Sequence, residues 1–449
     1  ELTCRDWSSD VCSSDLKTKS LFSDLFPLGG HLDPKNRWLK IEKLIPWDDL
    51  MLAYSRHFSD RGRPAKDGRL VIGLILLKHM TGLSDQDVVQ SMLENPYQQY
   101  FCGYEQFITE KVIDSSSLSK IRKRVGVEFF KELEARCYGV LIEKRIIKPG
   151  GMLVDGTVIS ESIAYPNDVG LLNKARERMV TIVKTIGKKI GKTFRTRPRE
   201  ARKKFLSFSK KKRKTKKEIH KATKSMLQYL GRNLKQVREA IEIARDKGMA
   251  IASWMVRQLL DAERLYAQQK EMYDRKSHRV DDRIVSLHKP YIRPIVRGKG
   301  GGKQVEFGPK VAVSHVDGFA FLDVFDYDNF SEATVLPDQV EAYENRFGKN
   351  PPSVTADKLY GNRENRSMLN EEGIRSALSP LGRPREDAKH EKRWQKKKQR
   401  ERNRIEGAFG CAKEHYGLDR ILYRGKEGGE TWVRLGFLGM NLMTAMRRA

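Results

Sequence analysis

Residues 399–413 read QRERNRIEGAFGCAK, and this stretch organises the interpretation of the whole chain. In a helix, Arg402, Glu406, Phe409 and Lys413 stand at i, i+4, i+7 and i+11, a spacing that puts all four on one face. A carboxylate with an arginine one turn before it and a lysine two turns after it suits a group that holds a divalent metal beside a phosphate. The same spacing also describes an exposed helix with ion pairs. The functional interpretation therefore requires two more carboxylates upstream.

Two upstream segments have the pattern of a short buried strand that ends in an aspartate. Residues 152–155 read MLVD, and residues 353–357 read SVTAD. Open α/β sheets present site residues at strand ends, although a strand-end aspartate also commonly caps a turn. We expect Asp155 and Asp357 to be the partners of Glu406.

The charge balance points to a polyanionic partner. The chain has 449 residues, enough for two or three domains, and 87 Lys and Arg against 58 Asp and Glu give a net charge of +29. So large an excess favours nucleic acid over simple solubility or a membrane surface. No apolar run approaches the ~20 residues that span a bilayer, so no membrane partner is expected.

The first 16 residues need separate treatment. Residues 6–16, DWSSDVCSSDL, back-translate to a short-read sequencing adapter, so we expect residues 1 to about 16 to be translated library sequence. The alternative is a genuine polar tail. Outside this segment the cysteines are Cys102, Cys137 and Cys411. They are far apart and form no disulfide or zinc pattern, which is typical of a protein of the reducing cytoplasm.

Two segments carry candidate DNA-binding cations. The chain before residue 148 is expected to be helical, with one helix from Gly68 to Met80 and the next capped by Ser84, either as a DNA-reading helix-turn-helix or as an ordinary hairpin. A serine cluster then starts a helix whose basic face either contacts phosphates or is only solvated. That face comprises Lys120, Arg122, Lys123 and Arg124.

Residues 170–285 read as long basic helices without a strand pattern. Such helices suit contact with a phosphate backbone, and a solvated arm or dimerisation element is the alternative. The candidate DNA-binding residues here are Lys210, Lys211, Lys212 and Arg213.

After this segment the pattern predicts a hairpin of strands 310–316 and 319–325 around Asp317-Gly318. Ser331 is expected to cap the following helix, with Asp328 and Glu332 as capping residues and not catalytic ones.

The spacing of Arg402, Glu406 and Lys413 resembles the signature around the last catalytic acid of DDE transposases from bacterial insertion sequences. Segments 96–103, 114–124 and 165–172 resemble the insertion sequence five, or insertion sequence four-like, group of these transposases. The family has a tyrosine where this chain has Gln399, which puts that residue's contact in doubt.

The resemblance implies a fold class of α/β: a ribonuclease-H-like catalytic core over 149–425, preceded by an all-α N-terminal DNA-binding domain over 17–148. A basic helical insertion at about 170–285 interrupts the core, and a C-terminal helix occupies 426–449.

The resemblance also implies a function. Asp155, Asp357 and Glu406 would be the catalytic and metal-binding residues for two Mg²⁺ ions, with Mn²⁺ as a possible substitute. Arg402 and Lys413 would contact DNA. The protein would cut the terminal inverted repeats of its own element and join their 3′ ends to target DNA, as a homo-oligomer on double-stranded DNA in the bacterial cytoplasm, associated with the nucleoid. The alternatives are a catalytically inactive DNA-binding relative and another ribonuclease-H-like nuclease.

Overall fold

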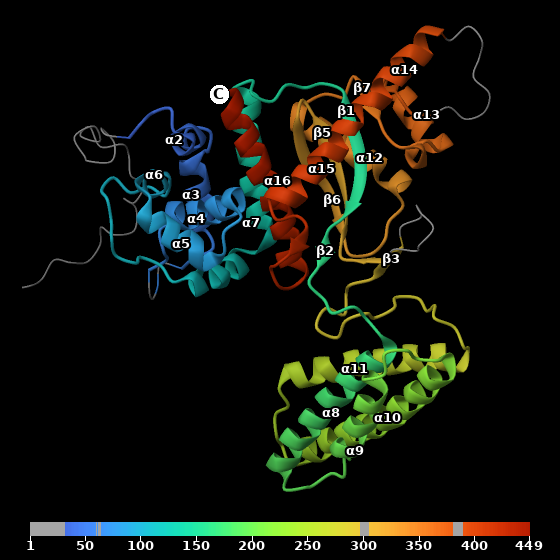
Figure 1. Ribbon diagram of the computed structural model, residues 1–449. Coiled ribbons are helices and arrows are strands. Elements are labelled where there is room, and N and C mark those ends of the chain that lie inside the picture. The colour runs from blue at the N-terminus through green and yellow to red at the C-terminus, as the bar shows by residue number, and fades with distance from the viewer. Residues whose placement is uncertain (1–31, 60, 62–63, 297–304, 380–388) are drawn as a thin grey trace, which may run out of the picture. The chain divides into compact units, whose positions relative to one another are not determined.

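The protein is a mixed α/β chain, and the computed structural model describes residues 32–59, 61, 64–296, 305–379 and 389–449 (Figure 1). It divides into two compact units. Unit 1 comprises Glu1–Glu161 and Pro309–Ala449, and unit 2 comprises Ser162–Gly308. The adapter-like residues 1–16 lie outside the described residues.

Unit 1 contains a five-stranded sheet of order β6-β5-β1-β7-β8. The strands β6, β5 and β1 are antiparallel neighbours, whereas β1, β7 and β8 run parallel. Their bounds are Met152–Val158 (β1), Lys310–Val316 (β5), Phe319–Asp326 (β6), Ser353–Thr355 (β7) and Arg375–Ser376 (β8). The predicted hairpin is confirmed, and its turn residues Asp317 and Gly318 both have the positive φ that a tight hairpin turn favours.

The prediction that the first strand ends at Asp155 is wrong. Strand β1 continues to Val158, because its pairing with β5 extends as far as Val158 opposite Lys310. Its pairing with β7 runs only to Leu153 opposite Thr355. Asp155 therefore lies within one strand but beyond the end of that strand's parallel neighbour, and this is where an open sheet exposes site residues.

The N-terminal part of unit 1 is helical in the described residues. Helix α4 (Gly68–Thr81) is buried along most of its length, with Asp67 capping its start and Gly82 ending it in the left-handed conformation. The predicted Ser84 cap is confirmed, since its Oγ accepts the Asp87 N–H at 3.1 Å. The other helices are α2 (Arg37–Glu42), α3 (Trp47–Ser55), α5 (Asp85–Glu94), α6 (Pro96–Phe101) and α7 (Ser115–Glu143).

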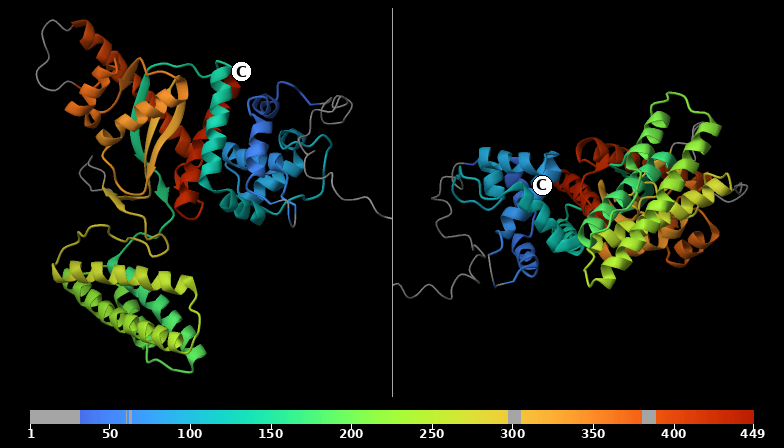
Figure 2. Two further views of the ribbon diagram at one scale, coloured as in Figure 1. Left: turned by 180° about the vertical axis from the view of Figure 1, so that it is seen from behind. Right: turned by 90° about the horizontal axis from the view of Figure 1, so that it is seen from below.

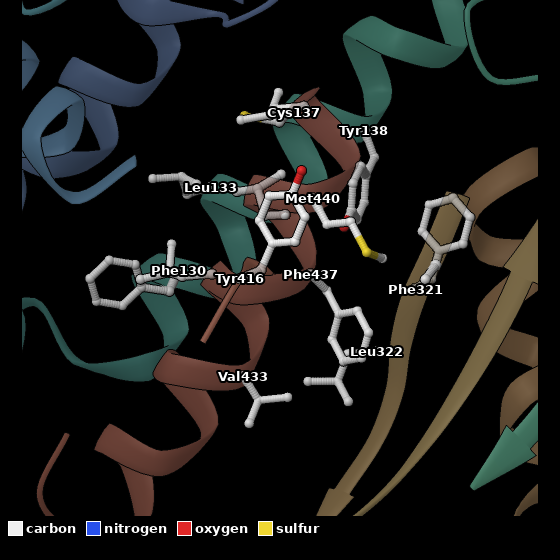
Figure 3. Packing of buried hydrophobic residues seen from close by; sticks show 14 of the residues in the cluster. Phe130, Leu133, Cys137, Tyr138, Phe321, Leu322, Tyr416, Val433, Phe437 and Met440 are labelled. Carbon is white, nitrogen blue, oxygen red and sulfur yellow. The ribbon is translucent and has the colours of Figure 1, made fainter. Parts of the chain in front are cut away.

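Helix α16 (Lys426–Arg448) joins these helices to the sheet. Figure 3 shows Phe437 and Met440 of α16 between Leu133 of α7 and Phe321 of β6, in one apolar cluster. Asn441 adds polar contacts in this core: its Nδ2 donates to the Tyr138 hydroxyl and to the Ala320 carbonyl, and its Oδ1 accepts the Ala320 N–H. Burying these apolar side chains stabilises unit 1 by about 25 cal/mol for each Å² removed from water.

The other helices of unit 1 precede or follow the parallel strands β7 and β8 in the sequence. A short 3-10 helix, η2 (Glu332–Val335), precedes α12 (Leu336–Phe347), and another, η3 (Lys358–Tyr360), precedes α13 (Arg363–Glu371). The predicted side-chain cap by Ser331 is wrong, because Ser331 makes no such bond and a separate helix, α12, begins at Leu336. The last elements are α14 (Lys389–Glu401), α15 (Asn403–His415) and the small sheet of β2 (Ser160–Glu161) with β9 (Arg420–Ile421).

Unit 2 is a bundle of helices with its own apolar core (Figure 2). Its longest helix, α10, begins with a capping box in which the Thr215 Oγ1 accepts the Glu218 N–H and the Glu218 carboxylate accepts the Thr215 N–H. The elements are α8 (Asp168–Ile190), α9 (Pro198–Ser209), α10 (Lys216–Asp246), α11 (Ser253–Asp274) and the strand pair β3 (Pro294–Val296) and β4 (Val305–Phe307). In the described residues, none of the protein's helices is long and apolar enough to cross a membrane.

Candidate active site

Asp155 is a half-buried carboxylate in the middle of β1. Its Oδ1 accepts the N–H of Gly156 at 2.9 Å. The pKa of Asp155 is raised to about 6, chiefly by burial and also by the negative charges of Glu332 and Asp357, against the opposing effects of the Gly156 N–H and Arg402. Asp155 thus carries a negative charge that a nearby cation would stabilise.

Asp357 and Glu406 share one cation. Asp357 follows β7 and caps η3, where its Oδ1 accepts the Lys358 N–H at 2.7 Å. Arg402 places Nη1 3.3 Å from Asp357 Oδ1 and Nη2 3.1 Å from Glu406 Oε1. Because Arg402 also lowers the pKa of Asp155, its guanidinium acts on all three predicted acids.

The predicted helix is interrupted at Arg402, between α14 and α15, but Arg402 keeps a helical backbone conformation. Arg402 and Glu406 are therefore in contact, as their spacing on one helix face predicts. Further along α15, the Lys413 Nζ donates to the Thr157 Oγ1 of β1 at 3.1 Å. Ile405, Phe409 and Ala412 supply the buried side chains that hold α15 in place.

Gln399, which stands where the family has a tyrosine, has a structural position of its own. Its side-chain amide donates to the carbonyl of Ala356, beside Asp357, and to the carbonyl of Ala377, which follows β8. The glutamine thus ties the loops that follow two parallel strands to the helix that leads to Glu406.

Glu332 is a neighbour of Asp155 that the sequence does not identify. The sequence predicts that it caps a helix, but its Oε1 pairs with the Lys310 Nζ at 3.2 Å. The side chains of Glu332 and Lys310 are 15% and 14% exposed. A Cβ on Gly156 would come within 3.0 Å of Glu332 Oε1. The glycine directly after Asp155 was the one available signal, because it indicates close approach of another group.

The predicted DNA-binding face of α7 divides into two kinds of cation. Lys120 and Lys123 are exposed. The Arg122 Nη1 instead donates to Asp85 Oδ1 at 3.0 Å, and its guanidinium lies 4.2 Å from the centre of the Tyr423 ring. The Arg124 Nε donates to the His57 carbonyl. Both arginines therefore already have a partner within unit 1, although Arg124 is exposed like the two lysines.

The four predicted cations of unit 2 lie between α9 and α10. Lys210 follows the last residue of α9, and Lys211 pairs with Glu218 of α10. Lys212 and Arg213 are exposed in the connection.

Within the described part of the chain, no three His, Cys, Asp or Glu side chains converge closely enough to enclose a metal ion. Arg402 instead supplies the positive charge between Asp357 and Glu406. The donor chemistry still suits a hard divalent cation, because Asp155 and Asp357 offer carboxylate oxygens and the charge of Asp155 is disfavoured by burial.

Two family models match the chain. Residues 26–124 match "Transposase domain (DUF772)", and residues 354–443, which include Asp357 and Glu406, match "Transposase DDE domain". No solved structure matches the chain significantly.

Among curated proteins, one similar sequence is "Uncharacterized protein ORF8 in nfe locus" of Rhizobium meliloti. It is 34% identical over 177 residues, which cover 38% of this chain and 86% of the relative.

These findings define the class as a transposase with a DDE domain, and hence an enzyme of DNA transposition. Within that class, the chain belongs to the same family as the Rhizobium meliloti ORF8 protein.

Proposed function

We propose that the chain is the transposase of an insertion sequence, which binds the terminal inverted repeats, cuts the DNA ends and joins them to target DNA. The observation that carries the proposal is the action of one guanidinium, that of Arg402, on three acids from distant parts of the sequence. The DDE-domain match over two of these acids adds support.

The sheet supports a ribonuclease-H-like core. Its order β6-β5-β1-β7-β8, with an antiparallel half and a parallel half, follows the order that this fold requires, with α15 packing across β1. We propose residues 149–425 as the catalytic domain, interrupted by the helical bundle of unit 2. The helices before residue 148 would then bind the DNA ends.

The residues present fit a divalent metal such as Mg²⁺, with Mn²⁺ as a substitute. Asp155, Asp357 and Glu406 would hold it, with the Arg402 guanidinium contacting a phosphate instead of the carboxylates. When bound, the two ions that the resemblance implies would supply activation of the attacking oxygen and stabilisation of the leaving oxygen.

The chain's own groups have separate roles in this proposal. Arg402 would hold Asp357 and Glu406 in place before DNA arrives, and then contact a phosphate oxygen through its planar donors. Lys413, held beside β1 by Thr157, would contact a neighbouring phosphate. Because two DNA ends must be brought together, we propose a homo-oligomer on DNA.

The test is cleavage and joining of labelled DNA ends of the native element in Mg²⁺. Glu406→Gln is compared with Glu414→Gln, a control on the same helix whose side chain is 77% exposed. Wild type and control should cut and join, while Glu406→Gln should only bind. Hydrolysis without joining would favour a nuclease, and binding without cleavage by all three proteins would favour an inactive relative.

A further inference from the structure

A cavity in unit 1 gathers cations from three distant parts of the sequence, away from the acids of the proposed active site. Its volume is about 850 Å³, and α4, α5, α7 and the segment around the start of α16 line it. The lining cations are Lys78, Arg122, Lys123, Arg424 and Lys426, and the lining acids are Asp85 and Glu427. The wall therefore carries five formal positive charges and two negative ones.

The floor of this cavity holds more positive than negative charge in a buried place. Lys78 and Arg122 share the single carboxylate of Asp85, with Lys78 Nζ 3.2 Å from Oδ1 and Arg122 Nη1 3.0 Å from the same oxygen. The side chains of Lys78 and Arg122 are only 6% and 8% exposed. Buried cations normally find enough partners to neutralise them, so one carboxylate for two cations leaves a deficit of negative charge.

The neighbours of Lys78 and Arg122 fix these cations in place. Arg122 lies over the ring of Tyr423 and Lys78 beside the ring of Trp432, at 5.6 Å from its centre. The Lys78 Nζ also donates to the Leu83 carbonyl at 3.1 Å. An anion entering the cavity would meet a preorganised positive surface and would not have to order it, which favours binding.

The rim adds cations that are accessible. Lys123 and Arg424 are exposed, and among the described residues no carboxylate lies within ion-pair distance of either. The backbone at the start of α16 also lines the cavity, and its N-cap is Gly425, which has no side chain to satisfy the first N–H groups. A helix start beside clustered cations favours an anion.

We propose that this cavity binds a backbone phosphate of DNA. This inference rests on the proposed function for the identity of the polyanion. Two observations favour DNA over a small free anion: Lys123, which lines the cavity, is exposed, and Lys120 continues the exposed basic surface one turn back along α7. The cavity is a second DNA contact, separate from Arg402 and Lys413, that anchors the duplex and carries out no chemistry.

The experiment compares two cavity variants of the full chain with matched controls. Lys123→Gln with Arg424→Gln removes two rim charges, and Lys43→Gln with Lys349→Gln removes two exposed charges elsewhere in unit 1. Ser119→Glu introduces a negative charge into the cavity wall. Ser116→Glu does so at an exposed position of the same helix that does not line the cavity.

Two quantities are measured for each protein. One is the affinity for duplex DNA as a function of salt, and the other is the rise in melting temperature produced by inorganic pyrophosphate. Both cavity variants should bind DNA about tenfold or more weakly. The double variant should also flatten the slope of log K against log salt by about 1.8, which is 0.9 for each lost phosphate contact. Pyrophosphate should stabilise the wild type and both controls but not the cavity variants.

Unchanged DNA affinity and salt slope in the cavity variants would overturn the proposal. So would a loss of pyrophosphate stabilisation with unchanged DNA binding, because the cavity would then hold only a small anion. Wild-type protein that binds no duplex DNA also overturns it. Cleavage separates the two hypotheses: a wild type that binds DNA through the cavity but cuts nothing preserves this inference and removes the proposed catalytic function.

Discussion

The cations of the proposed active site in unit 1 and those of α10 in unit 2 are arranged in opposite ways. Arg402, Lys310 and Lys413 each meet a specific side chain. On α10, the lysine row comprises Lys217, Lys221, Lys224 and Lys235, all exposed on the face opposite the buried apolar residues. In the described residues no carboxylate lies within ion-pair distance of this row.

Paired and unpaired cations therefore have different roles: paired cations position side chains, and unpaired cations attract a polyanion. Paired cations fix the geometry of a site, because each pair defines where two side chains lie. Unpaired cations in a row repel one another and are relieved by any polyanion that lies along them. We therefore expect the proposed active site of unit 1 to determine chemistry, and the lysine row of unit 2, like the cavity of unit 1, to contribute salt-sensitive affinity.

The largest expected effect is on the unit 1 side of this comparison. Asp155→Asn should reduce cleavage at least about a thousandfold, the order of loss when a member of a catalytic unit is removed, and should leave DNA affinity unchanged. The matched control is Glu341→Gln, an exposed carboxylate on α12. Rates are measured on labelled DNA ends at saturating protein. Equal rates for Asp155→Asn and the control would remove Asp155 from the site.

The next effect in size concerns acid, which should change the stability of unit 1 through His315. The pKa of His315 is lowered to about 4 by burial and by the charges of Arg404 and Arg448, against the opposing charge of Asp317. Between pH 6.5 and 4 the unfolded histidine binds a proton that the folded one does not, so the contribution of His315 to the free energy of unfolding of unit 1 should fall as the pH falls through this window, while Asp155, whose pKa is raised, contributes in the opposite direction. The loss has an upper limit of roughly 3 kcal/mol.

Urea unfolding at several pH values, followed by hydrogen exchange for each unit, measures this loss. The free energy of unfolding of wild-type unit 1 relative to that of His315→Gln should fall as the pH falls from 6.5 to 4, whereas relative to His415→Gln, which replaces an exposed histidine, it should not change. A difference between wild type and His315→Gln that does not depend on pH would show the prediction to be wrong.

The lysine row gives a smaller effect, confined to affinity. Replacing Lys217, Lys221 and Lys224 with Gln should weaken duplex DNA binding about tenfold near physiological salt and flatten the log–log salt slope by up to about 2.7. Cleavage at saturating DNA should not change. The control replaces Lys184, Lys188 and Lys189, exposed on α8, with Gln. Equal losses in both triple variants would mean that only net charge matters.

The smallest effect concerns local stability. Thr215→Ala removes the capping box of α10 and should lower the free energy of unfolding of unit 2 by about 1 kcal/mol. Ser84→Ala should lower that of unit 1 by a similar amount, because Ser84 caps α5 in the same way. Hydrogen exchange within each unit measures both changes. Destabilisation of both units by either variant would show that they unfold together.

Much of the secondary structure followed from local signals. The Asp317-Gly318 turn, the Ser84 cap and the serine cluster at the start of α7 each act within a few residues, so the sequence alone was sufficient to predict them. The extent of β1 beyond Asp155 was not predictable in this way. It depends on pairing with β5, which lies on the far side of unit 2 in the sequence.

The site was predictable only in part. The spacing of Arg402 and Glu406 predicted their contact, because one helical turn fixes it. The pairing of Glu332 with Lys310 and the burial of Arg122 against Asp85 depend on contacts between separate elements. The periodicity of the segments that contain Glu332 and Arg122 does not indicate such contacts.

The contacts of Asn441 have a consequence for how the chain is made. Strand β6 lies at the edge of the sheet, and Asn441 occupies the N–H and the carbonyl of Ala320 as a neighbouring strand would. During synthesis this edge exists well before α16 has emerged, so the unpaired strand is open to other chains in that interval. By occupying these two groups of Ala320, Asn441 of α16 removes them from pairing with a strand of another chain.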